Sequence, residues 1–253
     1  MFLRKISNHM KDQSWFAVVV DFVIVFVGVF VGLQAQDWSN ARQFDQLERD
    51  YLAELADEIR LNNELTAGHS EMMALIVESG ERAIEFLAQD KPCETECWPH
   101  VVDFFAASQV FFSPISTTVY DEMRRLGLLR TASIKPALSS YYVLSTTVFS
   151  SLDPNPAYRL RIRELLSVPA HRALWGVCHG VKDGIEFMAM DCPPGLPNED
   201  TKALLERFRS DSSLPGLLNY WVGMHVLWTP RLGQIGDQGA AAVLSIEAAL
   251  TAG

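Results

Sequence analysis

Hydrophobic residues gather in one run near the N-terminus. Residues 16–33 contain fourteen Val, Ile, Phe or Leu, and the other four positions are Ala17, Asp21, Gly28 and Gly32. Each large apolar side chain favours membrane insertion by about 0.3–0.6 kcal/mol, whereas the single acid opposes it by at most about 3 kcal/mol. The run therefore predicts a helix that crosses a lipid bilayer.

Two tryptophans mark the ends of this predicted span, which covers residues 15–38. At 1.5 Å per residue, Trp15 and Trp38 lie roughly 35 Å apart, close to a hydrocarbon core of about 30 Å, and indole rings suit the two headgroup zones. A cleavable signal peptide is the alternative. Its apolar region is only about 7–15 residues long and ends in a small-x-small site, whereas here Leu33 stands two positions before Ala35. We therefore expect an uncleaved signal anchor.

Charge predicts the orientation of this helix. The tail 1–14 carries Arg4, Lys5 and Lys11 against one acid, whereas the whole chain has a formal net charge of −10. The positive-inside rule leaves the basic tail in the cytoplasm and exports residues 39–253. Because the sequence is bacterial in character, we expect the inner membrane and a periplasmic domain. An acidic surface also repels phosphate backbones, so nucleic acid is not an expected partner.

Beyond residue 38, apolar residues recur every three or four positions: Phe44, Leu47, Tyr51, Leu55 and Ile59. This spacing predicts an amphipathic helix continuous with the span, to about residue 65, where Gly68 interrupts it. A second helix then runs to about residue 90.

A loop rich in Pro and Cys occupies residues 91–100, and helical periodicity returns in most segments of 101–253. No strand-like alternation persists, so the predicted fold class is all-α: an N-terminal membrane helix continuing into a tethered helical bundle. We favour a helix for the apolar segment 100–116, and helices for 157–166 and 169–178. The segment 214–228 is too short for a second membrane pass and contains Asn219 and His225, so we expect a buried core helix.

Two patches of sequence resemble a known family. The first comprises Asp21, Gly28, Gly32, Leu33, Gln34, Asp37 and Trp38, and the second comprises Thr118, Tyr120, Asp121, Glu122, Leu126, Gly127, Leu138 and Tyr141. Together they resemble a family of bacterial single-pass inner-membrane proteins of unknown function, in which the membrane helix begins with an acid and ends in Leu-Gln and, shortly after, Trp. The chain departs from that pattern at Ser39 and Asn40. The resemblance implies a location and an architecture, and no reaction.

The four cysteines are Cys93, Cys97, Cys178 and Cys192. An even number in an exported segment favours disulfides, and four cysteines allow three connectivities. The most local one, Cys93–Cys97 with Cys178–Cys192, is the one we expect. The alternative is a metal site of Cys93, Cys97 and His100 with Cys178 or His179, although this spacing is not that of a zinc finger or a haem-attachment motif.

Candidate catalytic groups are few. Asp121 and Glu122 are adjacent, so they point to different faces of a helix and do not form a carboxylate pair for acid–base catalysis. They are typical of the first turn of a helix that ends at Gly127, with Ser116, Thr117 or Thr118 as the cap. The chain also lacks the usual metalloprotease, hydrolase, P-loop and dinucleotide motifs. We therefore expect no catalytic residue, metal or cofactor.

The interruptions of the apolar run share one face of the helix. At 100° per residue, Asp21, Gly28, Gly32 and Ala35 form a narrow stripe, and glycines four apart let membrane helices approach closely. We expect a non-enzymatic membrane protein whose helix self-associates or docks on a partner, with the exported domain as an interaction or sensing module. Two alternatives remain: an accessory subunit of an ion-driven membrane complex that uses Asp21, and a tethered periplasmic enzyme.

Overall fold

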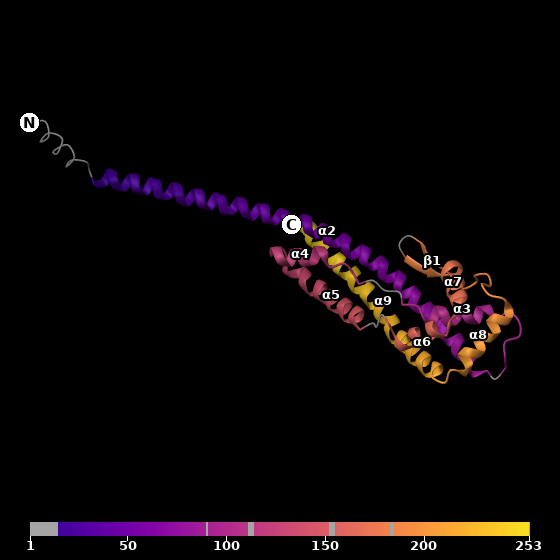
Figure 1. Ribbon diagram of the computed structural model, residues 1–253. Coiled ribbons are helices and arrows are strands. Elements are labelled where there is room, and N and C mark those ends of the chain that lie inside the picture. The colour runs from indigo at the N-terminus through magenta and orange to yellow at the C-terminus, as the bar shows by residue number, and fades with distance from the viewer. Residues whose placement is uncertain (1–14, 90, 111–113, 152–154, 183–184, 253) are drawn as a thin grey trace, which may run out of the picture.

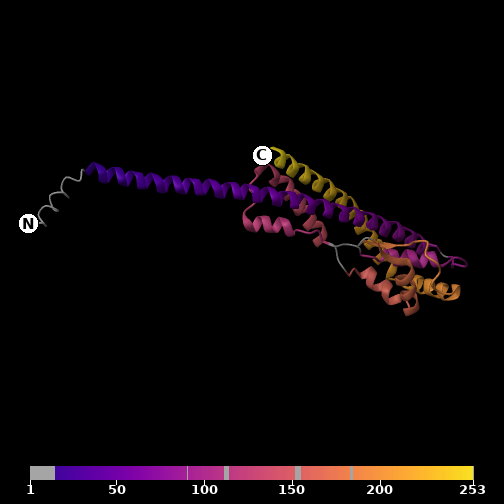
Figure 2. The same ribbon diagram turned by 90° about the horizontal axis from the view of Figure 1, so that it is seen from above.

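The fold is organised around one very long helix. The computed structural model describes residues 15–252 except 90, 111–113, 152–154 and 183–184. Helix α2 (Trp15–Ala88) has 74 residues and is about 110 Å long at 1.5 Å per residue. Its N-terminal half projects from the body of the molecule, and its second half is the spine of a helical bundle (Figures 1 and 2).

Helix α2 passes through Gly68 without a break, so the expected interruption there is wrong. Gly68 lies between buried turns of the same helix, with Thr66 on one side and Met73 and Ile76 on the other. A glycine inside a helix costs about 1 kcal/mol, whereas burial of one large aliphatic side chain contributes about 1.5–3 kcal/mol. Packing on both sides of Gly68 therefore outweighs its low helix propensity.

The second long element is helix α9 (Leu214–Ala252), whose 39 residues run antiparallel to α2. The C-terminus returns to the point where α2 leaves the bundle (Figure 1). The helix expected over 214–228 is present but forms only the first part of α9, which continues through Pro230. Proline removes the hydrogen bond to the carbonyl four residues earlier, on Val226. Since Pro230 and Val226 are both exposed, water can bind that carbonyl, and the helix persists.

Shorter elements complete the bundle in chain order: α3 (Trp98–Ala107), α4 (Thr118–Leu126), η1 (Ala132–Ile134), α5 (Lys135–Ser150), α6 (Ala157–Leu165), α7 (Val168–Ala173), η2 (Leu174–Cys178) and α8 (Asn198–Ser210). Helix α3 is shorter than the expected 100–116. It ends where the Ser108 hydroxyl and amide both donate to the Phe105 carbonyl, which closes the last turn.

Two hydrophobic cores lie along α2. The proximal core, nearer the projecting half of α2, joins α2, α4, α5 and the last part of α9 through Leu55, Ile59, Met123, Leu138, Tyr141, Ile235 and Ile246. The distal core joins the end of α2 to α3, α6, α8 and the first part of α9 through Phe104, Phe105, Tyr158, Ile162, Phe208 and Leu218. Since α2 and α9 contribute to both cores, they tie the two halves into one body.

The bundle is all-α as predicted, apart from one small hairpin that the sequence analysis missed. Strands β1 (His179–Lys182) and β2 (Ile185–Met188) pair antiparallel, with His179 opposite Met188. The expected helix over 169–178 is present, as the α-helix α7 followed directly by the π-helix η2, and the hairpin begins at the next residue. The hairpin is closed by the Cys178–Cys192 disulfide and by a 2.7 Å hydrogen bond from the Ala189 amide to the Cys178 carbonyl. The two strands lack the alternation of apolar and polar residues that predicts a strand, and the disulfide and this hydrogen bond stabilise the hairpin instead.

Candidate functional site

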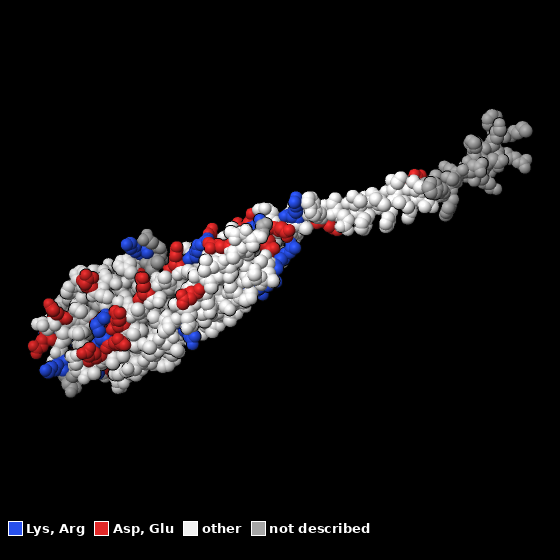
Figure 3. All heavy atoms as spheres, turned by 180° about the vertical axis from the view of Figure 1, so that it is seen from behind, with Lys and Arg blue, Asp and Glu red and all other residues white. Residues whose placement is uncertain are grey.

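The projecting half of α2 carries the predicted stripe. Among the described residues, α2 is the one helix long and apolar enough to cross a membrane, and none of its apolar window is buried. Asp21, Gly28, Gly32 and Ala35 are all exposed, and a Cβ added at Gly28 or Gly32 would meet no atom within 4 Å. Figure 3 shows this part almost free of charged side chains, whereas acids and bases are spread over the bundle. The helix thus fits a membrane anchor, and no other residue that the structure describes covers its stripe.

One of the two expected headgroup tryptophans is described in full. Trp38 is exposed, and the Arg42 guanidinium lies over its ring, 4.1 Å from the ring centroid. An indole with a cation beside it suits the boundary between apolar and polar surroundings. The side chain of Trp15 lies outside the described residues.

Where α2 enters the bundle, two of its carboxylates bind the chain around α4. Glu58 Oε2 accepts hydrogen bonds from the Val119 amide at 2.9 Å and from the Ser116 hydroxyl at 2.8 Å. Glu58 Oε1 accepts from the Tyr142 hydroxyl at 3.2 Å. A carboxylate at this position binds the free amides of the first turn of α4 and matches its dipole.

Glu48, one of the few charged side chains in the core, holds the turn that follows α4. Its Oε1 accepts from the amides of Arg130 and Thr131, both at 2.9 Å, and from the Thr131 hydroxyl at 3.1 Å. Asn62, also buried, makes a reciprocal pair with the Ser116 backbone at 2.8 Å in both directions. We call Glu48, Glu58 and Asn62 the α2 polar cluster. The helical pattern of the sequence does not reveal the α2 polar cluster, because glutamates on an amphipathic helix normally face solvent.

The family-like motif lies against this cluster and has structural roles. Thr118 begins α4, and Tyr120 stacks on Tyr142 with ring centroids 3.9 Å apart. Gly127 ends the helix with a φ of 70°, as the sequence predicts. Tyr141 is fully buried in the proximal core, and burial raises its pKa to about 12. A hydroxyl with that pKa remains protonated at neutral pH.

The adjacent acids of the motif serve as salt-bridge partners on the helix surface. Asp121 accepts a 2.7 Å hydrogen bond from the Thr117 hydroxyl, and Glu122 lies 3.0 Å from the Arg125 guanidinium. Thr117 occupies the cap position, but its side chain does not bond the helix backbone. The Ser116 hydroxyl accepts from the Thr118 amide at 3.4 Å. Capping is therefore shared between Ser116 and Glu58.

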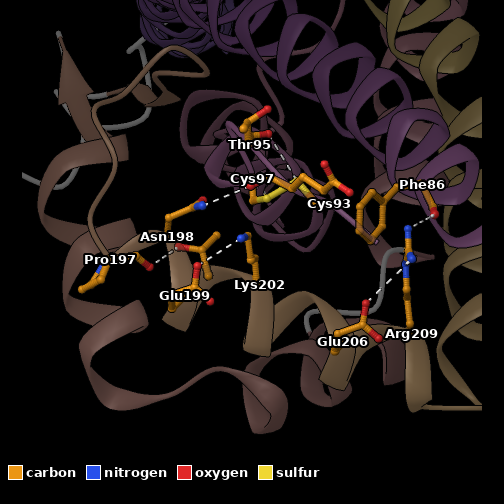
Figure 4. The surroundings of a disulfide bond; sticks show 12 residues. Phe86, Cys93, Thr95, Cys97, Pro197, Asn198, Glu199, Lys202, Glu206 and Arg209 are labelled. Carbon is orange, nitrogen blue, oxygen red and sulfur yellow. Dashed lines mark hydrogen bonds and ion pairs between the residues drawn. A yellow bond between two sulfur atoms is a disulfide. The ribbon is translucent and has the colours of Figure 1, made fainter. Parts of the chain in front are cut away.

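The cysteines pair in the most local connectivity. Cys93–Cys97 and Cys178–Cys192 are disulfides, with Cα–Cα distances of 5.8 and 5.1 Å. Both lie at the end of the bundle remote from the projecting helix; Figure 4 shows the first of them against α8. The alternative, a thiolate metal site, is wrong because the four sulfurs form two disulfide bonds and none is a free thiolate. In the described part of the chain, no three His, Cys, Asp or Glu side chains are arranged to hold a metal ion.

The histidines named with that alternative have other surroundings. His100 packs on Phe86 at 4.6 Å between ring centroids, and burial lowers its pKa. His179 packs on Trp175, and its Nε2 lies 3.4 Å from the Glu186 carboxylate. His100 thus packs between α3 and α2, whereas His179 on β1 contacts η2 and β2, so the two rings have separate surroundings.

Comparison of the chain with protein-family models, with curated protein sequences and with solved structures finds no match. The function is therefore argued from the geometry described above.

Proposed function

We propose that this chain is a non-enzymatic, single-pass membrane protein whose helix α2 self-associates within the bilayer. Its exported bundle then acts as an interaction or sensing module. The observation that carries the proposal is the uncovered stripe of Asp21, Gly28, Gly32 and Ala35 on a helix that continues unbroken into both cores.

The stripe supports helix–helix contact in lipid for a physical reason. Lipid tails are as apolar as valine or phenylalanine, so apolar side chains alone do not drive membrane helices together. Close packing does, and the open space over Gly28 and Gly32 lets a second backbone approach. A second copy of the chain brings an identical stripe, which suits a symmetric pair.

Continuity of α2 supports coupling between the membrane and the bundle. The α2 polar cluster attaches α4 and the turn before α5 to the same helix that carries the stripe. A rotation or shift of the membrane segment therefore moves a rigid spine, together with the elements bound to it. An interaction at the far end of the bundle can act on the membrane helix by the same route.

The proposed location is the bacterial inner membrane, with the N-terminus in the cytoplasm and the bundle in the periplasm. Two disulfides support an oxidising compartment for the bundle. The basic residues before the span support a cytoplasmic N-terminus. Reaction of an engineered cysteine in the tail with a membrane-impermeant maleimide in intact cells would contradict this orientation.

Cysteine cross-linking tests self-association. All four native cysteines are in disulfides, so Gly28→Cys and Gly32→Cys each introduce the single free thiol of the chain. We expect oxidation in membranes to give a covalent dimer or a higher species. Phe30→Cys is the matched control, because it lies about 180° around the helix from Asp21. Equal cross-linking at position 30, or none at 28 and 32, would count against the stripe.

A second candidate function is favoured by the position of Asp21. An acid within a membrane span faces protein or water and commonly marks a proton or ion route. Asp21 shares the face of the two glycines, so a multi-pass partner seated there would meet its carboxyl. As an accessory subunit of an ion-driven complex, the chain would lose a proton-dependent phenotype on Asp21→Asn while keeping normal protein level and bundle stability. An unchanged phenotype would remove this candidate.

A further inference from the structure

A pocket lies at the end of the bundle remote from the projecting half of α2. It has a volume of about 550 Å³ and is formed between the turn that precedes α3 and the segment that leads into α8. Its apolar lining includes Trp98, Pro99, Met190, Pro194 and Leu196. A hollow of this size falls within the range of ligand sites in proteins, about 300–1,000 Å³.

Both disulfides form part of the pocket wall. Cys97 and Cys192 line it from opposite segments, and each is bonded to a cysteine outside the lining, Cys93 and Cys178. The two segments are joined by a 3.2 Å hydrogen bond from the Asn198 side-chain amide to the Glu94 carbonyl (Figure 4). Each disulfide therefore constrains its own segment and the hydrogen bond joins the two, which lowers the entropic cost of binding a ligand between them.

A hydrogen-bond donor without an acceptor among the described residues lies buried behind the wall of the pocket. Trp98 is 3% exposed, and its Nε1 has no partner among the described residues. The edge of the indole that carries Nε1 faces Gly195, since Cζ2 on that edge would lie 3.2 Å from a Cβ at this glycine. Because this N–H is buried directly behind the wall of the pocket, a ligand that packs on the wall changes its surroundings.

Two acids at the pocket have no basic partner within the described chain. Glu96 and Asp191 line it, and neither takes part in a salt bridge there. Glu96 also has a φ of +52°, the one positive value for a described residue other than glycine. Glu96 lies within the short loop that the Cys93–Cys97 disulfide closes, which holds this uncommon conformation in place.

We propose that this distal pocket binds an extended segment of a partner protein that carries a Lys or Arg next to an apolar residue. The cation lies against Glu96 and Asp191, and the apolar side chain packs on Pro194, Leu196 and Met190. Trp98 also lines the pocket, so its indole reports the arrival of the segment. The site is separate from the stripe on α2, so its test and the cross-linking test succeed or fail independently.

The full chain in detergent micelles, with its disulfides intact, is titrated with two pools of N-acetylated pentapeptide amides. One pool has Lys or Arg at the central position and the other has Glu, with mixed apolar neighbours in both. The readout is the indole N–H resonance of Trp98, assigned by its loss in Trp98→Phe. We expect the basic pool to shift this resonance with a dissociation constant of about 1 mM or tighter, and the acidic pool to leave it unchanged.

Charge variants test the role of the acids. The double variant Glu96→Gln with Asp191→Asn should bind the basic pool about threefold to tenfold more weakly, because two partly exposed ion pairs are lost. The control Glu64→Gln with Glu71→Gln removes two exposed acids in the middle of α2 and should bind as the unmodified chain does. The proposal is overturned if neither pool shifts Trp98, if the acidic pool shifts it equally, or if both double variants bind equally well.

Discussion

Replacing Glu48 by alanine tests how strongly the α2 polar cluster holds the bundle to the helix. Glu48 is 7% exposed, and its Oε1 accepts from two backbone amides and one hydroxyl. Glu48→Ala removes the acceptor and leaves the amides of Arg130 and Thr131 without a protein partner. The turn between α4 and α5 then loses its buried attachment to α2 and keeps only the exposed pair of Arg130 with Asp45 among the polar contacts described above.

The expected loss follows from those contacts. An unpaired buried donor costs about 1–3 kcal/mol. Since the turn is half-exposed, water can reach part of it, so we expect about 2–3 kcal/mol for both amides rather than the upper limit. For a domain of this size, each kcal/mol lowers Tm by about 2–4 °C. Glu48→Ala should therefore melt about 5–10 °C below the unmodified chain, measured by far-UV circular dichroism in detergent.

Asp45→Ala is the matched control. Asp45 lies one turn earlier on α2 and pairs with the side chain of the same Arg130 at 3.1 Å, but both side chains are more than half exposed. Such a pair is worth about 0–1 kcal/mol, so its loss should lower Tm by no more than about 4 °C. Melting temperatures for Glu48→Ala and Asp45→Ala that agree within error would refute the structural role given to Glu48.

Three further predictions concern the bundle. Gly127→Ala should cost about 1–2 kcal/mol in urea unfolding because its φ of 70° disfavours a side chain, whereas Gly233→Ala, in an exposed turn of α9, should be neutral or stabilising; equal effects would contradict this. Paired Cys→Ser variants should cost about 3 kcal/mol for Cys178–Cys192 but about 2 kcal/mol for Cys93–Cys97, since the sequence separations are 14 and 4; the reverse order of Tm values would count against this. Burial lowers the pKa of three histidines, His69, His100 and His225. The unfolded chain therefore binds their protons at higher pH than the folded chain does, so stability is full above about pH 6.5 and declines below it; a Tm unchanged between pH 7.5 and 5.5 would contradict the assignment.

Local features of the sequence were the easiest to predict. The apolar run of α2, the stop at Gly127 and the all-α class each depend on residues close together in the chain. Features that depend on distant contacts were missed. Gly68 predicts a break in α2 and the expected helix 214–228 ends well before α9 does, but the packing of α2 against α9 keeps both helices continuous.

The features of the candidate site also differ in whether the sequence alone could predict them. The stripe of Asp21, Gly28, Gly32 and Ala35 follows from helical periodicity alone, and the structure leaves it uncovered. The roles of Glu48 and Glu58 required the tertiary structure, because their partners are 82 and 61 residues away in the chain. The distal pocket likewise joins segments that only the fold brings together.

The sequence by itself determined that α2 carries an apolar segment suited to a bilayer, because each residue's transfer from water to lipid depends mainly on its own chemistry. It also determined the stripe, since the helical repeat is constant. Tertiary structure decided which acids became buried acceptors, where a strand pair replaced a helix and which two loops enclose a pocket. Those outcomes depend on which surfaces meet, and burial sets the energy of an unpaired donor or carboxylate only after they have met.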